Sequence, residues 1–170
     1  MTKNLNAPGR KINLLYVLDH ESPVDLEWRK KISKHFYLLR KEGLVAERDP
    51  FSLPEDDVRR CASEAEVVLL LVSPDLLCME NTKLLDECFN LYERDGFPRI
   101  IPVIVRECNW KDVKRYANLT SLPRQSAPVA KWSDADSALA SVAKDVRGVV
   151  ESFGKKPRSV PFLPECGPWD

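Results

Sequence analysis

The chain has 170 residues, enough for one domain of ordinary size with a buried core. Its 26 lysines and arginines balance its 26 aspartates and glutamates, so no overall charge attracts nucleic acid or an anionic membrane surface. No apolar run approaches the roughly 20 residues of a membrane span, and residues 1–10 lack the apolar core of a signal peptide. We therefore expect a cytoplasmic protein that binds neither nucleic acid nor membranes.

The cysteines give no sign of a disulfide framework or a structural metal site. They are odd in number, form no CxxC pair and have no matching pair of histidines: Cys61, Cys78, Cys88, Cys108 and Cys166. We therefore expect no bound metal.

The first predicted strand covers the apolar residues 12–18 (INLLYVL). Ser22 then begins a helix as its cap, with Pro23 in the first turn and Asp25 three residues after the cap. Gly43 ends this helix in the left-handed conformation. One face of the helix carries apolar residues at intervals of four and three: Val24, Trp28, Ile32, Phe36 and Leu39.

The next segments predict two strands separated by a short helix. Residues 44–48 form a short second strand, and a polar loop leads from it to a helix over residues 56–64. Residues 67–72 (VVLLLV) are apolar at every position, which is typical of a strand buried on both faces of a parallel sheet. We therefore expect this third strand near the centre of the sheet.

A helix carrying Glu87 follows and ends at Gly96. Residues 99–106 (RIIPVIVR) predict the fourth strand, and Pro102 inside it indicates an edge position or a bulge. The apolar face of the helix that carries Glu87 consists of Leu84, Leu85, Cys88, Leu91 and Tyr92.

The remaining segments predict one helical turn over residues 112–116 and a short fifth strand over residues 128–132. A capping box at residues 133–136 then begins the last helix. The apolar stripe of this helix consists of Leu139, Val142, Val146, Val150 and Phe153.

This alternation of strands and helices predicts an α/β fold, a flavodoxin-like, doubly wound parallel sheet of five strands with helices on both faces. Residues 11–153 form the expected domain. Residues 1–10 are expected to be a flexible N-terminus, and the Pro-rich residues 154–170 a tail or linker.

The sequence lacks the familiar catalytic motifs GxGxxG, GxxxxGK[ST], GxSxG and HExxH. Asp19 and Glu21 after the first strand suggest a response regulator with a magnesium-bound phosphoacceptor. That interpretation needs an aspartate at the end of the third strand, where Ser73 and Pro74 stand instead. A response regulator also needs a lysine at the end of the fourth or fifth strand, and Lys131 is only a weak match. We therefore disfavour the response-regulator interpretation.

Glu87 is the most informative candidate for a functional residue. It lies on the helix that follows the third strand and its Ser73-Pro74-Asp75 turn. Ligands of open α/β sheets collect beyond the carboxyl ends of the parallel strands, so a carboxylate near this point is a functional candidate. From spacing alone, a solvated helix residue is the alternative.

Six segments, in their order and spacing, resemble a bacterial-type Toll/interleukin-1 receptor (TIR) domain over residues 11–153. They are KINLLYVLDHES, LLRKEGLV, VVLLLVSPDLL, LLDECFNLYE, RIIPVIVRECNW and SLPRQSAPVAKWSDADSALASV. The resemblance implies the flavodoxin-like TIR fold and homo-oligomers formed through TIR–TIR contacts. In the enzymatic members it also implies cleavage of the nicotinamide–ribose bond of NAD, as an effector of defence or cell-death signalling.

The resemblance also implies a catalytic residue. Glu87, with Glu93 six residues further on, matches the catalytic glutamate of the family. One carboxylate suits the reaction because cationic nicotinamide leaves without a general acid, unlike the leaving group of an ordinary glycoside. The enzyme then has to stabilise an oxocarbenium-like ribose, which one carboxylate can do. NAD is here the substrate, and no cofactor is expected.

The resemblance places Glu87 in a cleft between residues 16–21 and residues 48–54. Four residues are expected to bind the substrate there: Tyr16, Asp19, Arg48 and Asp49.

The chain departs from the family pattern at both edges of this cleft. Leu15 and Val17 replace the small hydroxyl residues that commonly flank the aromatic residue of the first strand, and the loop after Glu47 is short. Two hypotheses therefore stand: an NAD-cleaving effector that acts upon self-association, and a non-catalytic adaptor that acts by homotypic protein–protein interaction.

Overall fold

The computed structural model describes residues 11–50, 53–124 and 127–153. They form a parallel sheet of four strands in the order β2-β1-β3-β4, with bounds Ile12–Val17 (β1), Val45–Arg48 (β2), Val67–Val72 (β3) and Arg99–Ile104 (β4). The α/β class and the parallel pairing are as predicted and compatible with a flavodoxin-like fold. The predicted N-terminus (1–10) and tail (154–170) lie outside the described residues.

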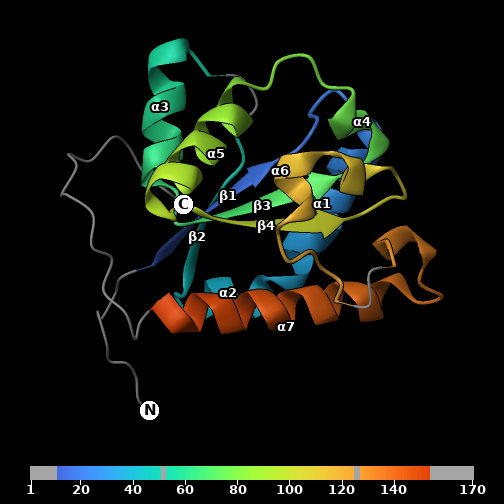
Figure 1. Cartoon of the computed structure of the whole chain (residues 1–170). Helices are drawn as coiled ribbons and strands as arrows, with labels where there is room; N and C mark the ends of the chain where they lie inside the picture. Colours follow the sequence, from blue (N-terminus) through green and yellow to red (C-terminus); the bar gives the residue numbers. More distant parts are fainter. Residues whose placement is uncertain (1–10, 51–52, 125–126, 154–170) are drawn as a thin grey trace.

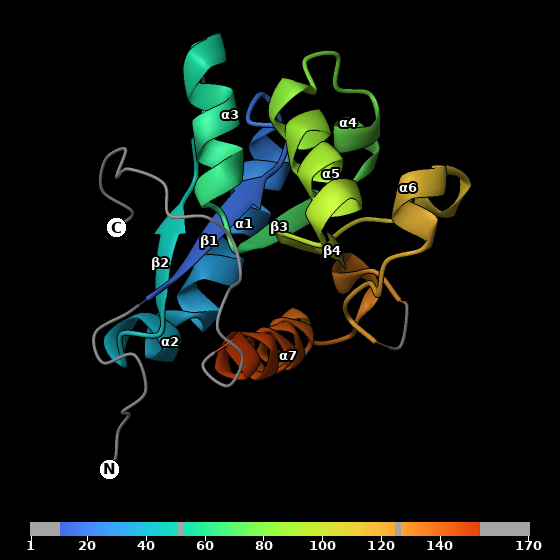
Figure 2. The same ribbon diagram turned by 60° about the vertical axis from the view of Figure 1, so that its left-hand side comes forward.

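Helices cover both faces of the sheet (Figure 1). One face carries α3 and α5, and the other carries α1, α2 and α7, an arrangement seen from a second side in Figure 2. The helix bounds are Pro23–His35 (α1), Tyr37–Lys41 (α2), Glu55–Glu64 (α3), Pro74–Leu77 (α4), Lys83–Asp95 (α5), Lys114–Ala117 (α6) and Ala135–Phe153 (α7), with 3-10 turns at Trp110–Asp112 (η1) and Val129–Lys131 (η2).

β3 lies inside the sheet between β1 and β4, and all six of its residues are buried, as predicted. Because side chains alternate along a strand, β3 supplies both cores. Leu69 packs in the core beneath α1 and α7, and Leu70 packs in the core beneath α3 and α5. Pro102 lies opposite Leu70 in β4, the outer strand on this side, so its predicted edge position is confirmed.

The predicted fifth strand over residues 128–132 is wrong. These residues form the 3-10 turn η2, and the neighbour of β4 is instead a single bridge between Val103 and Leu122. Pro123 and Pro128 lack the N–H that a strand must donate, which disfavours a continuous strand here. From the predicted segment, the N–H of Ala130 bonds the carbonyl of Val105 at 3.0 Å. The apolar residue Val129 of this segment is nevertheless fully buried.

The predicted first helix is divided into α1 and α2 at Phe36, so its continuity was wrongly predicted. Phe36 leaves the helical conformation with ψ near 10°, and its N–H bonds the carbonyl of Ser33. Its side chain is fully buried, so the bend coincides with packing of Phe36 into the core. Val24, predicted on the buried face, is 48% exposed.

The predicted helix ends are largely confirmed. Gly43 and Gly96 have φ of 74° and 77°, the left-handed conformation that glycine adopts without strain. Ser22 accepts the N–H of Asp25 at 3.2 Å, as the cap of α1. At α7 the cap is Asp134 rather than Ser133, because the Asp134 carboxylate accepts the N–H of Asp136.

None of the helices within the described ranges has the length and apolar character that a membrane span requires.

Candidate functional site

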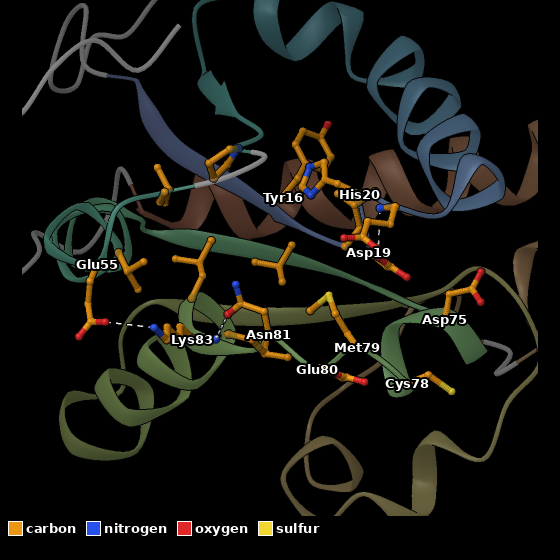
Figure 3. A pocket seen from close by; sticks show the side chains of 18 residues that line it. Tyr16, Asp19, His20, Glu55, Asp75, Cys78, Met79, Glu80, Asn81 and Lys83 are labelled. Carbon is orange, nitrogen blue, oxygen red and sulfur yellow. Dashed lines mark hydrogen bonds and ion pairs between the residues drawn. The ribbon is translucent and has the colours of Figure 1, made fainter.

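β1 and β3 flank a topological switch point of the sheet. The chain passes from β1 to β2 on one side and then returns past β1 to β3 on the other. Ligands of open parallel sheets bind outside the carboxyl ends of the strands at such a point. A cavity of about 650 Å³ opens there, of the size usual for small-molecule sites (Figure 3). We call it the switch-point cavity.

Two strand ends and the start of α5 build the walls of this cavity. Residues 16–21, at the end of β1, form one wall, and residues 78–81 together with residues 83–85 form the opposite wall. Pro50 and Leu53 contribute from the loop after β2. The cavity therefore lies between the two loops that the sequence predicted to bound a cleft.

Carboxylates predominate among the charged side chains of the lining. They come from both walls, from α4 and from the start of α3: Asp19, Glu21, Glu55, Asp75 and Glu80. Lys83 is the lysine of the lining, and its Nζ lies 3.0 Å from Glu55 in an exposed ion pair. Such a pair contributes little to stability and can open for a ligand.

Tyr16 lines the cavity, but its hydroxyl points away from it (Figure 3). The hydroxyl donates a hydrogen bond to Glu47, which also accepts from Ser33 at 3.1 Å and from Arg40 at 2.6 Å. Burial, together with the neighbouring Glu47 carboxylate, raises the pKa of Tyr16 well above its ordinary value. Tyr16 is therefore a neutral structural residue whose ring supports the cavity floor.

The predicted substrate-binding residues are divided between the cavity and the structure behind it. Asp19 lines the cavity, whereas Arg48 and Asp49 do not. Asp49 lies 2.5 Å from Nε2 of His20 and 2.8 Å from Nε of Arg29. Because His20 belongs to the lining, Asp49 acts on the cavity by holding this wall residue in place.

Glu87 lies on α5, one helical turn after Leu84, and is only partly buried. Leu84 and Leu85 line the cavity, but Glu87 is not among the lining residues. Its neighbour Asp86 is held by Arg115 at 2.9 Å, on the side of α6. The structure thus places the predicted catalytic residue next to the cavity and outside its wall.

A polar cluster that the sequence did not predict lies around Asp75, just beyond the end of β3. The fully buried Asp25 accepts a hydrogen bond from Ser73 and two from Arg106, at 3.1 and 3.3 Å. Nη2 of Arg106 also lies 2.5 Å from Asp75, and the hydroxyl of Ser22 donates to Asp75 at 2.7 Å.

The two carboxylates of this cluster have opposite pKa shifts. Burial raises the pKa of Asp25, although Ser73 and Arg106 oppose this effect. Hydrogen bonds from Ser22 and Arg106 lower the pKa of Asp75, which is half-buried.

Residues 78–81 were also missed, although a sequence signal for them existed. They come directly after α4, which begins at the end of β3, and the carboxyl end of a parallel strand is where a ligand is expected. The cluster around Arg106 had no comparable signal, because its members are spread over residues 22–106 of the chain.

Across the described residues, no group of three or more His, Cys, Asp or Glu side chains is arranged to hold a metal ion.

Comparison with known proteins finds a relative that covers most of this chain. The chain is 26% identical over 155 residues to the uncharacterized protein y4lF of Sinorhizobium fredii (strain NBRC 101917 / NGR234), a match over 84% of this chain and 45% of y4lF. The chain thus spans about half the length of that relative. No protein-family model matches the chain, and no solved structure matches it.

Proposed function

We propose that this domain binds NAD in the switch-point cavity and, when self-associated, cleaves its nicotinamide–ribose bond as a TIR-type effector. The observation that carries the proposal is the position of the cavity, at the switch point and between the loops after β1 and β2. The resemblance to TIR domains implies a substrate cleft between the same two loops.

The charge of the cavity supports one orientation of the substrate. Five carboxylates in the lining suit the cationic nicotinamide ring and the positive charge that develops on the ribose. They disfavour the diphosphate of NAD, which would lie toward Lys83 and displace its exposed pairing with Glu55.

Glu87 supplies the catalytic carboxylate in this reaction. Because Glu87 lies one turn beyond Leu84, the ribose of the substrate has to extend along α5 past Leu84 to meet it. A neighbouring copy that closes the cavity would push the substrate in this direction and exclude water, which strengthens the charge interaction. This requirement gives self-association a physical role in the reaction.

The position of Glu87 outside the lining favours one rival, a non-catalytic adaptor that acts by homotypic contacts. A scaffold needs the fold and its surfaces but no carboxylate at residue 87. The two functions therefore differ in what they require of this one side chain.

The test is release of nicotinamide from NAD by concentrated protein, followed by chromatography. We expect the Glu87→Gln variant to lose activity by at least about a hundredfold, as when a group that stabilises transition-state charge is removed. Its melting temperature should stay nearly unchanged, because the residue is only partly buried.

Glu93→Gln is the matched control, with the same chemical change on an exposed residue of the same helix. It should retain full activity. Equal activity of wild type and Glu87→Gln would remove Glu87 from the mechanism. Absence of nicotinamide release from the wild type under every condition, including enforced oligomers, would favour the adaptor.

A further inference from the structure

The cluster around Arg106 joins the ends of three strands. Ser22 follows the loop after β1, Asp75 follows β3, and Arg106 follows β4. The Ser22 hydroxyl and Nη2 of Arg106 both reach Oδ2 of Asp75, at 2.7 and 2.5 Å. The N–H groups of Val105 and Arg106 bond the carbonyl of Val72 at 3.0 and 3.5 Å and hold the end of β4 beside β3. The loop after β1 reaches Asp75 through the side chain of Ser22.

Two members of the cluster connect it directly to the cavity. Asp75 is a lining residue, and Ser22 follows the lining residue Glu21 in the chain. The hydrogen bond between Ser22 and Asp75 therefore ties the wall formed by the β1 loop to the wall formed by the β3 loop. Arg106 stands behind this bond and is not among the residues that line the cavity.

Asp25 holds the guanidinium of Arg106 from the buried side of the cluster. Its carboxylate is fully buried and accepts both Nε and Nη2 of Arg106, which fixes the plane of the guanidinium. A lysine offers one ammonium group and cannot keep this forked contact while reaching Asp75. The buried pair thus determines where the second carboxylate, Asp75, is held.

We propose that Arg106 is a positioning residue that sets the width of the switch-point cavity by holding Asp75 and, through it, Ser22. Arg106 sets this width in the unliganded protein whether or not NAD is the ligand. Only the effect of the width on NAD turnover rests on the proposed function. Loss of Arg106 releases Asp75 from one of its two partners and loosens both walls, while the reacting groups stay in place. A ligand of the cavity then binds less tightly.

The experiment compares Arg106→Gln and Arg106→Lys with the wild type. Hydrogen exchange of the unliganded protein should become faster in residues 18–22 and 75–81 in both variants, and less so in Arg106→Lys because it keeps the charge. In the active protein, KM for NAD should rise by about tenfold or more with a smaller change in kcat, the result expected when uniform binding is lost.

Two further variants keep the test decisive. Asp25→Asn/Arg106→Gln removes the buried charge together with its partner, so that the fold survives if Arg106→Gln alone does not. Arg147→Gln is the matched control: Arg147 is 31% exposed against 26% for Arg106, and it pairs with Glu42, a residue outside the cavity lining, at 2.8 Å. This control should alter neither the exchange of the two segments nor KM.

Faster exchange in both segments supports the positioning role. If neither the wild type nor the variants release nicotinamide, the proposed function is rejected, but the exchange result still supports the positioning role. Unchanged exchange at residues 18–22 and 75–81 in every folded Arg106 variant overturns the inference. So does a KM for NAD equal to that of the wild type in an active protein.

Discussion

Asp25 and Asp75 share one arginine, yet their pKa values move in opposite directions. Asp25 is fully buried, and loss of water outweighs its hydrogen bonds, so its pKa rises. Asp75 is 43% exposed, and the hydrogen bonds from Ser22 and Arg106 dominate, so its pKa falls. One guanidinium can therefore serve two roles, to neutralise a buried charge and to keep a cavity carboxylate ionised.

The lowered pKa of Asp75 predicts a contribution to stability at neutral pH that acid removes. Because the folded pKa lies below the unfolded value of about 3.9, ionised Asp75 stabilises the fold above that pH. This stabilisation is lost as the pH falls through the folded pKa. In urea unfolding from about pH 6 to pH 3, the free energy of unfolding of Asp75→Asn should therefore decrease less than that of the wild type.

The exposed Glu93→Gln variant is the control and should follow the wild-type curve. If the curves of Asp75→Asn and wild type run parallel over the whole range, Asp75 is not coupled to Ser22 and Arg106 in solution.

Individual residues were harder to predict from the sequence than the regions in which they lie. The loops that bound the cavity follow from the rule that ligands bind at strand ends, and Tyr16 and Asp19 do line it. The direction of a side chain depends on distant partners, so the network of Tyr16 with Glu47 and the place of Glu87 outside the wall could not be predicted.

At the scale of the elements, β3 is the part of the chain whose sequence and structure agree most closely. Its uninterrupted apolar run predicted a central strand, and alternate residues fill the two cores. The fifth strand and the unbroken first helix failed because propensity does not include tertiary contacts. Phe36 and Val129 are both buried in the core at points where the chain is not in a regular helix or strand.

We predict that Leu70→Ala lowers the free energy of unfolding by about 2–5 kcal/mol, because it leaves a cavity in the core beneath α3 and α5. The matched change Leu38→Ala, on a residue of α2 that is 56% exposed, should cost less than about 0.5 kcal/mol. Chemical denaturation measures both values. Similar losses at the two positions would show that β3 does not lie between two packed helix layers.

At the scale of the whole molecule, equal numbers of acidic and basic residues leave copies of the chain without strong mutual repulsion. The proposed function makes closure of the cavity depend on a neighbouring copy. Specific NAD-cleaving activity should therefore rise with protein concentration and should be high in a fusion that enforces oligomers. Specific activity that stays constant in a protein that remains monomeric by light scattering would contradict control by assembly.

The central claim is that the switch-point cavity holds the substrate, and binding of NAD observed residue by residue tests it most directly. Two-dimensional amide NMR spectra of the Glu87→Gln variant, which keeps the substrate intact, would be recorded during a titration with NAD. We predict progressive shifts at residues 16–21, 78–81 and 83–85, with none along the outer face of α7. Spectra that do not change at saturating NAD, or shifts confined to residues outside the cavity, would contradict the account.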